Sequence, residues 1–168
     1  AMTVMPGPQL AEALPITREL KRRRPRLTIV WGGYFPTMHP EPVLASGLVD
    51  YVVRGHNEIS FRRLVDALRA GEKLPPLAGI AVAGDAASLA SSRPGLVPDV
   101  DALPGFPYHR VAMERYLRPT FMGRRTISHH ASYGCPFRCN FCAVVNMVDG
   151  RYSAQSAARL AAIVEQLV

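Results

Sequence analysis

The first 71 residues alternate between short apolar runs and amphipathic segments. Apolar and β-branched residues fill Leu27–Trp31 and Val49–Val53, as in strands that are buried on both faces of a sheet. In Gln9–Leu20 and Phe61–Leu68 the apolar residues recur every three or four positions, which predicts amphipathic helices. With a strand end at Thr3–Met5, the order is strand, helix, strand, helix, strand, helix. This alternation predicts an α/β fold with a parallel sheet.

Prolines, glycines and capping residues set the expected limits of these helices. Pro15 should kink the first helix or restart it, because proline removes a hydrogen bond from a helix interior. Pro40–Leu44 predicts a short second helix. Asn57 or Ser60 is expected to cap the third helix, and Gly71 stands where a C-terminal glycine belongs.

The pattern changes after Pro75-Pro76. Ile80–Asp85 and the Ser/Ala-rich stretch that follows predict a small β-hairpin. Residues 93–107 contain Pro94, Pro98, Pro104 and Pro107, so they can form neither a helix nor a central strand and are expected to be a linker.

The last third returns to regular structure. Arg124–Ser132 has strand character, and Ser153 is expected to cap a last helix whose apolar face runs to Leu167. We therefore expect three parts, namely residues 1–75, 76–123 and 124–168.

The charge of the chain does not by itself indicate a partner. A net charge of +7 would suit an anion such as nucleic acid. However, the excess is mostly arginine that is scattered along the chain, and the run at Lys21–Arg24 ends a predicted helix, where cations complement the helix dipole. The sequence therefore favours no nucleic-acid partner. No apolar run reaches the roughly 18 residues of a membrane span, and residues 1–5 lack the features of a signal peptide.

All three cysteines of the chain lie close together, as Cys135, Cys139 and Cys142 in the spacing C-x3-C-x2-C. Thiolates this close on one loop can bind one inorganic centre, and an odd number cannot all pair as disulfides. Clustered cysteines without a disulfide pattern also suit a reducing cytoplasm. Three protein ligands would leave one metal position open, as at a catalytic zinc site.

Two other interpretations of the cysteines remain open from the residues alone. The first is a structural Cys3His zinc site, with His109, His129 or His130 as the fourth ligand. The second is a chance cluster of inert thiols.

The spacing C-x3-C-x-aromatic-C after Gly134 resembles the signature of the radical S-adenosylmethionine (SAM) enzymes. The resemblance implies that Cys135, Cys139 and Cys142 hold a [4Fe-4S] cluster and that Phe141 lies beside the adenine of SAM. In that family SAM binds the fourth iron, and one-electron reduction cleaves it to methionine and a 5′-deoxyadenosyl radical. A reductant such as flavodoxin or ferredoxin is therefore implied.

The first half resembles the cobalamin-binding domain that precedes the radical SAM barrel in one large subgroup. Gly32-Gly33 matches the Gly-Gly after the fourth strand of that domain, and Thr3-Val4-Met5 resembles its Ser-x-Leu mark. The resemblance implies that cobalamin lies on this edge, with its nucleotide tail beside the Gly-Gly turn. The residues implied to contact cobalamin are Thr3, Met5, Gly32, Gly33 and Gly55.

Parts of the family pattern are missing. Gly55-His56-Asn57-Glu58 stands where the family commonly has Gly-Glu-Gly-Glu, and the family's Asp-x-His-x-x-Gly loop would lie before residue 1.

If Gly33 has a negative φ, a valine there is expected to weaken cobalamin binding much more than folding, at a cost to the fold of about 1 kcal/mol.

The resemblance implies an overall organisation and a reaction class. The expected fold is a Rossmann-like parallel sheet, from part of a cobalamin-binding domain, followed by the first β/α unit of a radical SAM partial TIM barrel. A whole barrel runs to about 250 residues, so we expect the chain to be an inactive part of a longer enzyme. That enzyme would transfer a methyl group to a small molecule or lipid, or modify it by other radical chemistry.

Two alternatives to this function stay open. In one, the cobalamin-like domain of a radical SAM enzyme is merely a scaffold. In the other, the chain is a non-catalytic cobalamin- or nucleotide-binding module with a structural zinc site.

Overall fold

The structure is a computed structural model that describes residues 1–72, 76–95, 99–148 and 150–167. The chain forms two compact units, of which the first comprises residues 1–97 and 134–152 and the second residues 98–133 and 153–168. The boundary expected after Pro75 and the linker residue Pro98 lie outside the described residues.

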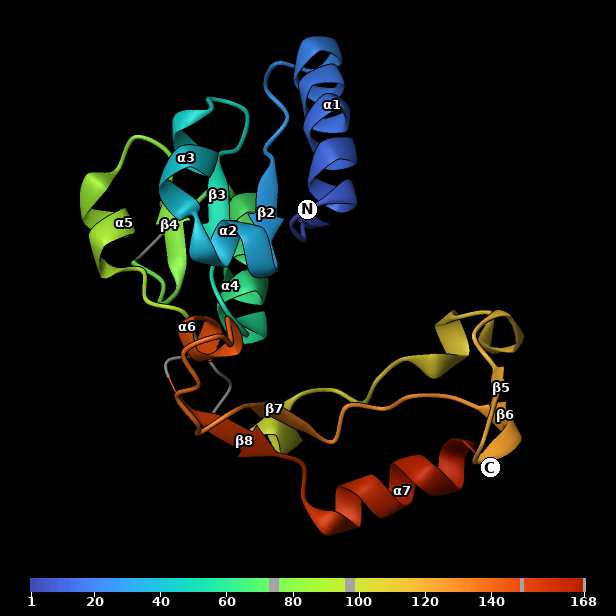
Figure 1. Cartoon of the computed structure of the whole chain (residues 1–168). Coiled ribbons are helices and arrows are strands. Elements are labelled where there is room, and N and C mark those ends of the chain that lie inside the picture. Colours follow the sequence, from blue (N-terminus) through green and yellow to red (C-terminus); the bar gives the residue numbers. More distant parts are fainter. Residues whose placement is uncertain (73–75, 96–98, 149, 168) are drawn as a thin grey trace. The chain divides into compact units, whose positions relative to one another are not determined.

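The first unit is built on a four-stranded sheet in the order β1-β2-β3-β4 (Figure 1). Strands β1, β2 and β3 are parallel, and β4 pairs antiparallel with β3. The predicted α/β class with a parallel sheet is therefore confirmed. The bounds of the four strands are β1 (Met2–Thr3), β2 (Val30–Gly32), β3 (Tyr51–Val53) and β4 (Ile80–Val82).

The prediction of a β-hairpin at Ile80–Asp85 is wrong. Ile80 and Ala81 point to opposite faces of β4, and both are buried, at 3% and 0% exposure. A strand with two buried faces extends an existing sheet, so β4 pairs with β3 and is followed by the helix α5 (Ala86–Ser91).

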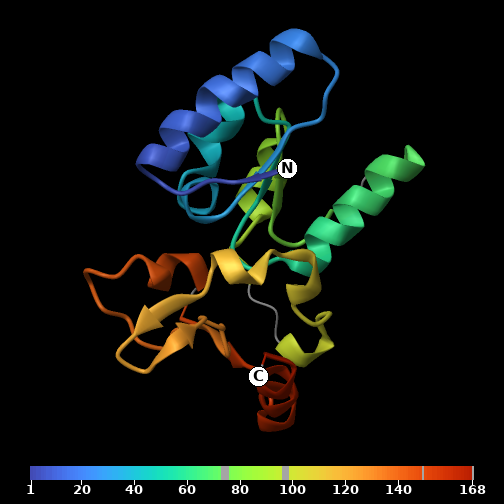
Figure 2. The ribbon, with the colours of Figure 1, turned by 90° about the vertical axis from the view of Figure 1, so that its right-hand side faces the viewer.

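Helices cover both faces of this sheet, and Figure 2 shows α1 and α4 on opposite sides of it. Trp31 and Val52 point to the face that packs against α1 and α3, whereas Val30 and Val53 point to the face that packs against Leu64 of α4. Both faces are apolar, as the continuous apolar runs predict. The bounds of these helices are α1 (Pro8–Arg23), α2 (Tyr34–Met38), α3 (Pro40–Ala45) and α4 (Glu58–Ala70).

The predicted helix limits are partly right. Helix α1 is one helix that runs through Pro15 without a restart, and Ala13 and Thr17 on either side of Pro15 are both buried. Asn57 precedes α4 as predicted, but its amide donates to the Arg54 carbonyl (2.6 Å) and forms no cap. Gly71 ends α4 with φ +67°, the left-handed conformation expected of a C-terminal glycine.

The second unit contains a two-stranded antiparallel sheet of β5 and β6. Residues 127–131, in the middle of the predicted strand Arg124–Ser132, are outside any strand. Thr126 already pairs with Arg118, the first residue of β5, so the residues beyond it have no partner strand. The elements here are η1 (Val100–Ala102), η2 (Tyr108–Arg110), η3 (Met113–Arg115), β5 (Arg118–Thr120), β6 (Gly123–Thr126) and α7 (Ala157–Leu167).

A further two-stranded sheet joins β7 (Ser132–Gly134) to β8 (Tyr152–Ala154), and the helix α6 (Val144–Val148) lies between them in the chain. Ser153 does not cap the last helix, because it lies within β8 and is buried. Ser156 takes that role, since its hydroxyl accepts the N–H of Arg159 (3.2 Å) just after the start of α7.

One carboxylate ties α1 to the sheet. Asp50 accepts a hydrogen bond from the Lys21 ammonium at 2.8 Å and one from the Ile29 N–H at 2.6 Å. The side chains of Lys21 and Asp50 are 18% and 39% exposed, so the ion pair is partly shielded from solvent.

We expect Asp50→Asn to lower the free energy of unfolding of the chain by about 1–2 kcal/mol, because it removes the ion pair with Lys21 and leaves the Ile29 N–H with a neutral acceptor. Urea unfolding would measure the change. The matched control is Glu19→Gln, which removes an exposed carboxylate of α1 from its pairs with Arg22 and Arg23 and should change nothing measurable. Equal effects of the two substitutions would contradict a special role of Asp50.

Candidate functional site

A pocket of about 230 Å³ opens in the first unit at the carboxyl ends of the parallel strands β1, β2 and β3. It brings together four of the five residues expected to contact cobalamin, namely Thr3, Gly32, Gly33 and Gly55. The fifth, Met5, is not among the lining residues and is 42% exposed. The other lining residues are Ala1, Met2, Val30, Val53, Asn57, Glu58 and Phe61.

Gly33 is required by the packing of the backbone. Its φ is +89°, and a Cβ there would lie 2.7 Å from Cγ2 of Thr3 and 3.1 Å from the backbone nitrogen of Val4. The turn is held against β1 by the N–H of Val4, which donates to the Gly32 carbonyl at 2.8 Å. The condition of a negative φ is therefore not met, and Gly33→Val would disturb the fold before it tested a ligand.

Gly32 has room for a side chain. A Cβ there would lie 3.5 Å from the carbonyl oxygen of Val53 and 3.6 Å from its Cβ, which are ordinary van der Waals contacts. Since Gly32 also lines the pocket, it is the position in the Gly-Gly turn where a substitution can probe ligand binding.

Gly55 joins the pocket to the segment that follows the cysteines. Its φ is +70°, and a Cβ there would clash with Gly95 and lie 3.0 Å from the carbonyl oxygen of Met147 in α6. The N–H of His56 donates to the Gly95 carbonyl at 2.7 Å. Helix α6 also packs against α2, so it lies at the carboxyl edge of the sheet.

Glu58 is a pocket residue that the sequence analysis did not assign to the site. It begins α4, directly after the loop that leaves β3. Two signals were available, namely this position at the ligand edge and the match of Glu58 to the last residue of Gly-Glu-Gly-Glu. The His56 ring, with Nδ1 3.8 Å from Oε1 of Glu58, lowers the pKa of that carboxyl below its ordinary value. Glu58 is therefore ionised at neutral pH.

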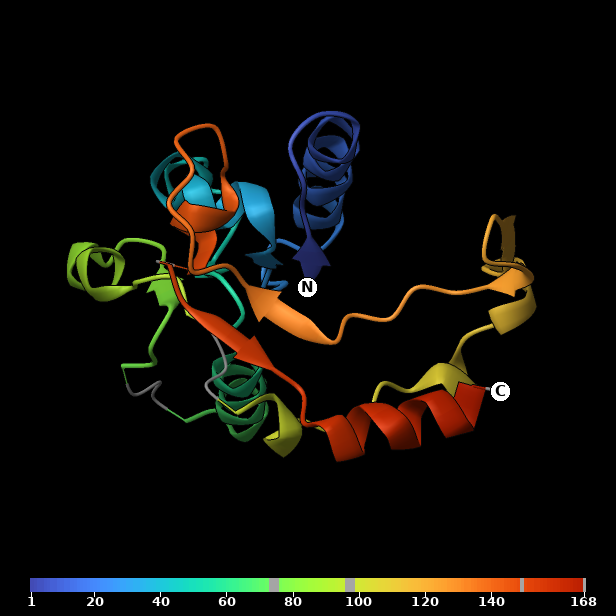
Figure 3. The same ribbon diagram turned by 60° about the horizontal axis from the view of Figure 1, so that its bottom comes forward.

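The three cysteines lie on the loop between β7 and α6. Figure 3 shows β7, this loop, α6 and β8 in orange and red. The loop is fixed at its start by the N–H of Cys135, which donates to the Arg151 carbonyl at 3.0 Å. Further along, the N–H of Cys142 donates to the Cys139 carbonyl at 3.1 Å. Phe141, expected beside SAM, is 88% exposed.

The donor chemistry of this loop fits an iron–sulfur cluster. All three thiols are free, with Cys139 exposed and Cys135 and Cys142 half-buried, so each can present a thiolate. The sulfurs are not gathered around one point: within the described residues, no three His, Cys, Asp or Glu side chains are arranged to hold a metal ion.

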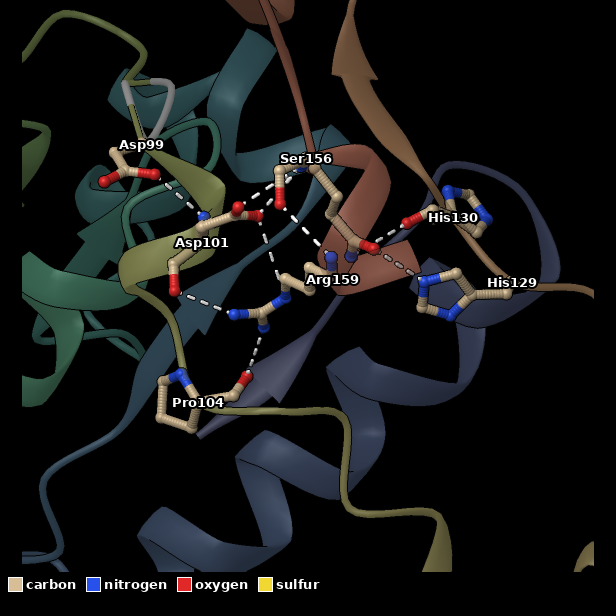
Figure 4. A network of polar contacts seen from close by, with 8 residues as sticks. Asp99, Asp101, Pro104, His129, His130, Ser156 and Arg159 are labelled. Atoms are coloured by element: carbon tan, nitrogen blue, oxygen red, sulfur yellow. Dashed lines mark hydrogen bonds and ion pairs between the residues drawn. The ribbon is translucent and has the colours of Figure 1, made fainter. Parts of the chain in front are cut away.

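His129 and His130 of the second unit make contacts of their own (Figure 4). Nδ1 of His129 lies 2.6 Å from the hydroxyl of Tyr108, and Nε2 lies 3.1 Å from Oε1 of Gln155. The amide of Gln155 donates to the His130 carbonyl at 3.4 Å. Both ring nitrogens of His129 are thus engaged by neutral partners, and burial raises the pKa of Tyr108.

A second group of contacts in Figure 4 holds the start of α7 to the proline-rich segment. The carboxylate of Asp101 accepts the N–H of Ser156 at 3.1 Å, and these bonds lower the pKa of Asp101. The Arg159 guanidinium donates to the carbonyls of Asp101 (2.8 Å) and Pro104 (3.1 Å). The predicted linker is therefore fixed here by the Ser156 N–H and the Arg159 side chain at the start of α7.

The part of the chain that lines the pocket matches a known protein family. Residues 1–65 match the B12 binding domain. They include every residue that lines the pocket.

Two curated relatives extend the similarity beyond the B12 binding domain. The chain is 30% identical over 128 residues to the anaerobic magnesium-protoporphyrin IX monomethyl ester cyclase of Synechocystis, covering 76% of this chain and 25% of the relative. It is 27% identical over 157 residues to an uncharacterized methyltransferase of Pyrococcus horikoshii, covering 93% of this chain and 33% of the relative. The chain thus spans a quarter to a third of the length of these relatives.

Two solved structures of TsrM, a radical SAM methyltransferase from Kitasatospora setae, share the fold. One holds a tryptophan substrate and aza-SAM, with a TM-score of 0.64 and 17% identity over 94% of this chain and 30% of that chain. The other holds cobalamin and a [4Fe-4S] cluster, with a TM-score of 0.62 and 18% identity over 94% of this chain and 31% of that chain.

The predicted resemblance to radical SAM proteins with a B12 binding domain is confirmed by these matches, as is the expected fold class. In the part of the chain that the structure describes, no helix is long and apolar enough to cross a membrane.

We expect Gly33→Ala to lower the free energy of unfolding by about 1 kcal/mol or more, because its positive φ and its contact with β1 both oppose a side chain. Gly32→Ala is the matched control and should be nearly neutral, since its Cβ makes ordinary contacts. Thermal unfolding of both variants would measure this. A neutral Gly33→Ala would show that the turn does not need glycine at this position.

Proposed function

We propose that this chain is part of a longer radical SAM enzyme in which the B12 binding domain binds cobalamin and the cysteine loop binds a [4Fe-4S] cluster and SAM. The main support is that the B12 binding domain and a C-x3-C-x2-C loop with three free thiols belong to one compact unit. The three parts proposed for the chain are residues 1–75, 76–123 and 124–168.

The cysteine loop would supply the ligands of the cluster. Cys135, Cys139 and Cys142 would each give one thiolate, which leaves one iron for SAM. Phe141 is exposed and can lie along the adenine. When bound, the reduced cluster supplies the electron that cleaves SAM. The contact of Cys135 with Arg151 would keep the first ligand in place.

The pocket at the carboxyl edge would hold the nucleotide tail of cobalamin. Thr3, Gly32, Gly33 and Gly55 contribute backbone and small side chains, which allow a large ligand to approach the strand ends closely. Bound cobalamin would serve as a methyl carrier. Helix α6 follows the cysteine loop and packs at this same edge, which supports a joint use of the two cofactors.

The proposed reaction is methyl transfer, or another radical modification, on a small molecule or lipid. A cyclase and methyltransferases among the similar proteins support this class. We further propose a flavodoxin or ferredoxin as electron donor and the cytoplasm as the compartment, because free thiols stay reduced there. No nucleic-acid partner is proposed.

The complete enzyme, reconstituted anaerobically with iron and sulfide, should turn brown and release 5′-deoxyadenosine from SAM under reducing conditions. Cys139→Ala should abolish both the visible absorbance and the product, because three thiolates are needed to hold the cluster. Asn140→Ala is the matched control, since Asn140 lies between two cysteines and supplies no thiolate.

Three results would separate the proposal from its rivals. A colourless protein with one zinc per chain would replace the cluster by a structural zinc site. A cluster-loaded enzyme that makes no 5′-deoxyadenosine would favour a binding module. Equal product formation with and without methylcobalamin would make the B12 binding domain a scaffold.

A further inference from the structure

The pocket has an unusual charge for a site that would take a nucleotide. Among its described lining residues Glu58 has the one charged side chain, and no lysine, arginine or histidine side chain lines it. The walls around the carboxylate are apolar and include Val30, Val53 and Phe61. Sites that bind phosphate rely on cationic side chains or on clustered backbone N–H groups, and a carboxylate beside them would repel the anion.

The carboxylate of Glu58 is placed to accept hydrogen bonds. It is ionised, because the neighbouring His56 lowers its pKa, and 50% of the side chain is exposed. An ionised carboxylate accepts hydrogen bonds and donates none. The other polar side chains of the pocket, Thr3 and Asn57, are neutral, so Glu58 offers the strongest acceptor among them.

We propose that Glu58 accepts a hydrogen bond from an uncharged donor of the bound ligand, a hydroxyl or a primary amide, and that it makes the pocket select cobalamin over phosphate-bearing nucleotides. The inference rests on the proposed cobalamin function. Cobalamin carries both donors, as the ribose hydroxyls of its nucleotide tail and as the amide side chains of the corrin. The phosphate of the tail then lies outside this pocket.

The test is a titration of the complete protein with hydroxocobalamin, followed by visible absorbance. Glu58→Gln keeps the size of the side chain but makes the hydrogen bond neutral, so we expect it to weaken binding about tenfold. Glu72→Gln is the matched control, because it removes the same charge at the opposite end of α4. Thermal unfolding of both variants should equal that of the wild type.

Two ligands complete the design. Cobinamide keeps the corrin amides but lacks the nucleotide tail, so a loss of affinity confined to cobalamin identifies a tail hydroxyl, and a loss for both identifies an amide. ADP should not compete with cobalamin on the wild-type protein. Unchanged cobalamin affinity in Glu58→Gln, equal losses in both variants, or competition by ADP would overturn the role of Glu58. A wild-type protein that binds no cobalamin would overturn the proposed function itself.

Discussion

The close approach of the Gly32-Gly33 turn to β1 is the constraint on which the carboxyl edge of the sheet depends. A Cβ on Gly33 would lie 2.7 Å from Thr3, so β1 and the turn can meet only where the side chain is missing. This contact places Thr3, Gly32 and Gly33 on one wall of the pocket. Gly33 was expected to be needed for ligand binding, but the fold itself needs it. The ligand would use the surface that this packing creates.

The same edge receives the segment that follows the cysteines. The Gly55 turn is enclosed by Gly95 and by the Met147 carbonyl of α6, and Arg151 donates to the Pro94 carbonyl nearby. These contacts join segments that are far apart in the sequence, through the backbone at Gly55 and through the Arg151 guanidinium at Pro94. They connect the cysteine loop and the pocket within one unit, as a cofactor pair that acts together would require.

The sequence predicts the parallel sheet well, because β2 and β3 are buried on both faces and their apolar runs are continuous. It also identifies the cysteine loop and four of the pocket residues. Pairing between distant strands cannot be seen in a local pattern, so β4 was predicted as a hairpin and Ser153 as a cap. The positive φ of Gly33 depends on its contact with β1, which the sequence does not reveal. The position of Glu58 in the pocket depends on how the strand ends meet in three dimensions.

We propose that cobalamin lies at the carboxyl edge of this sheet. A crystal structure of the complete protein grown with hydroxocobalamin tests it most directly. We expect the nucleotide tail to enter the pocket that Thr3, the Gly32-Gly33 turn and Glu58 line. Cobalamin bound elsewhere, with this pocket closed or filled by another part of the protein, would contradict it.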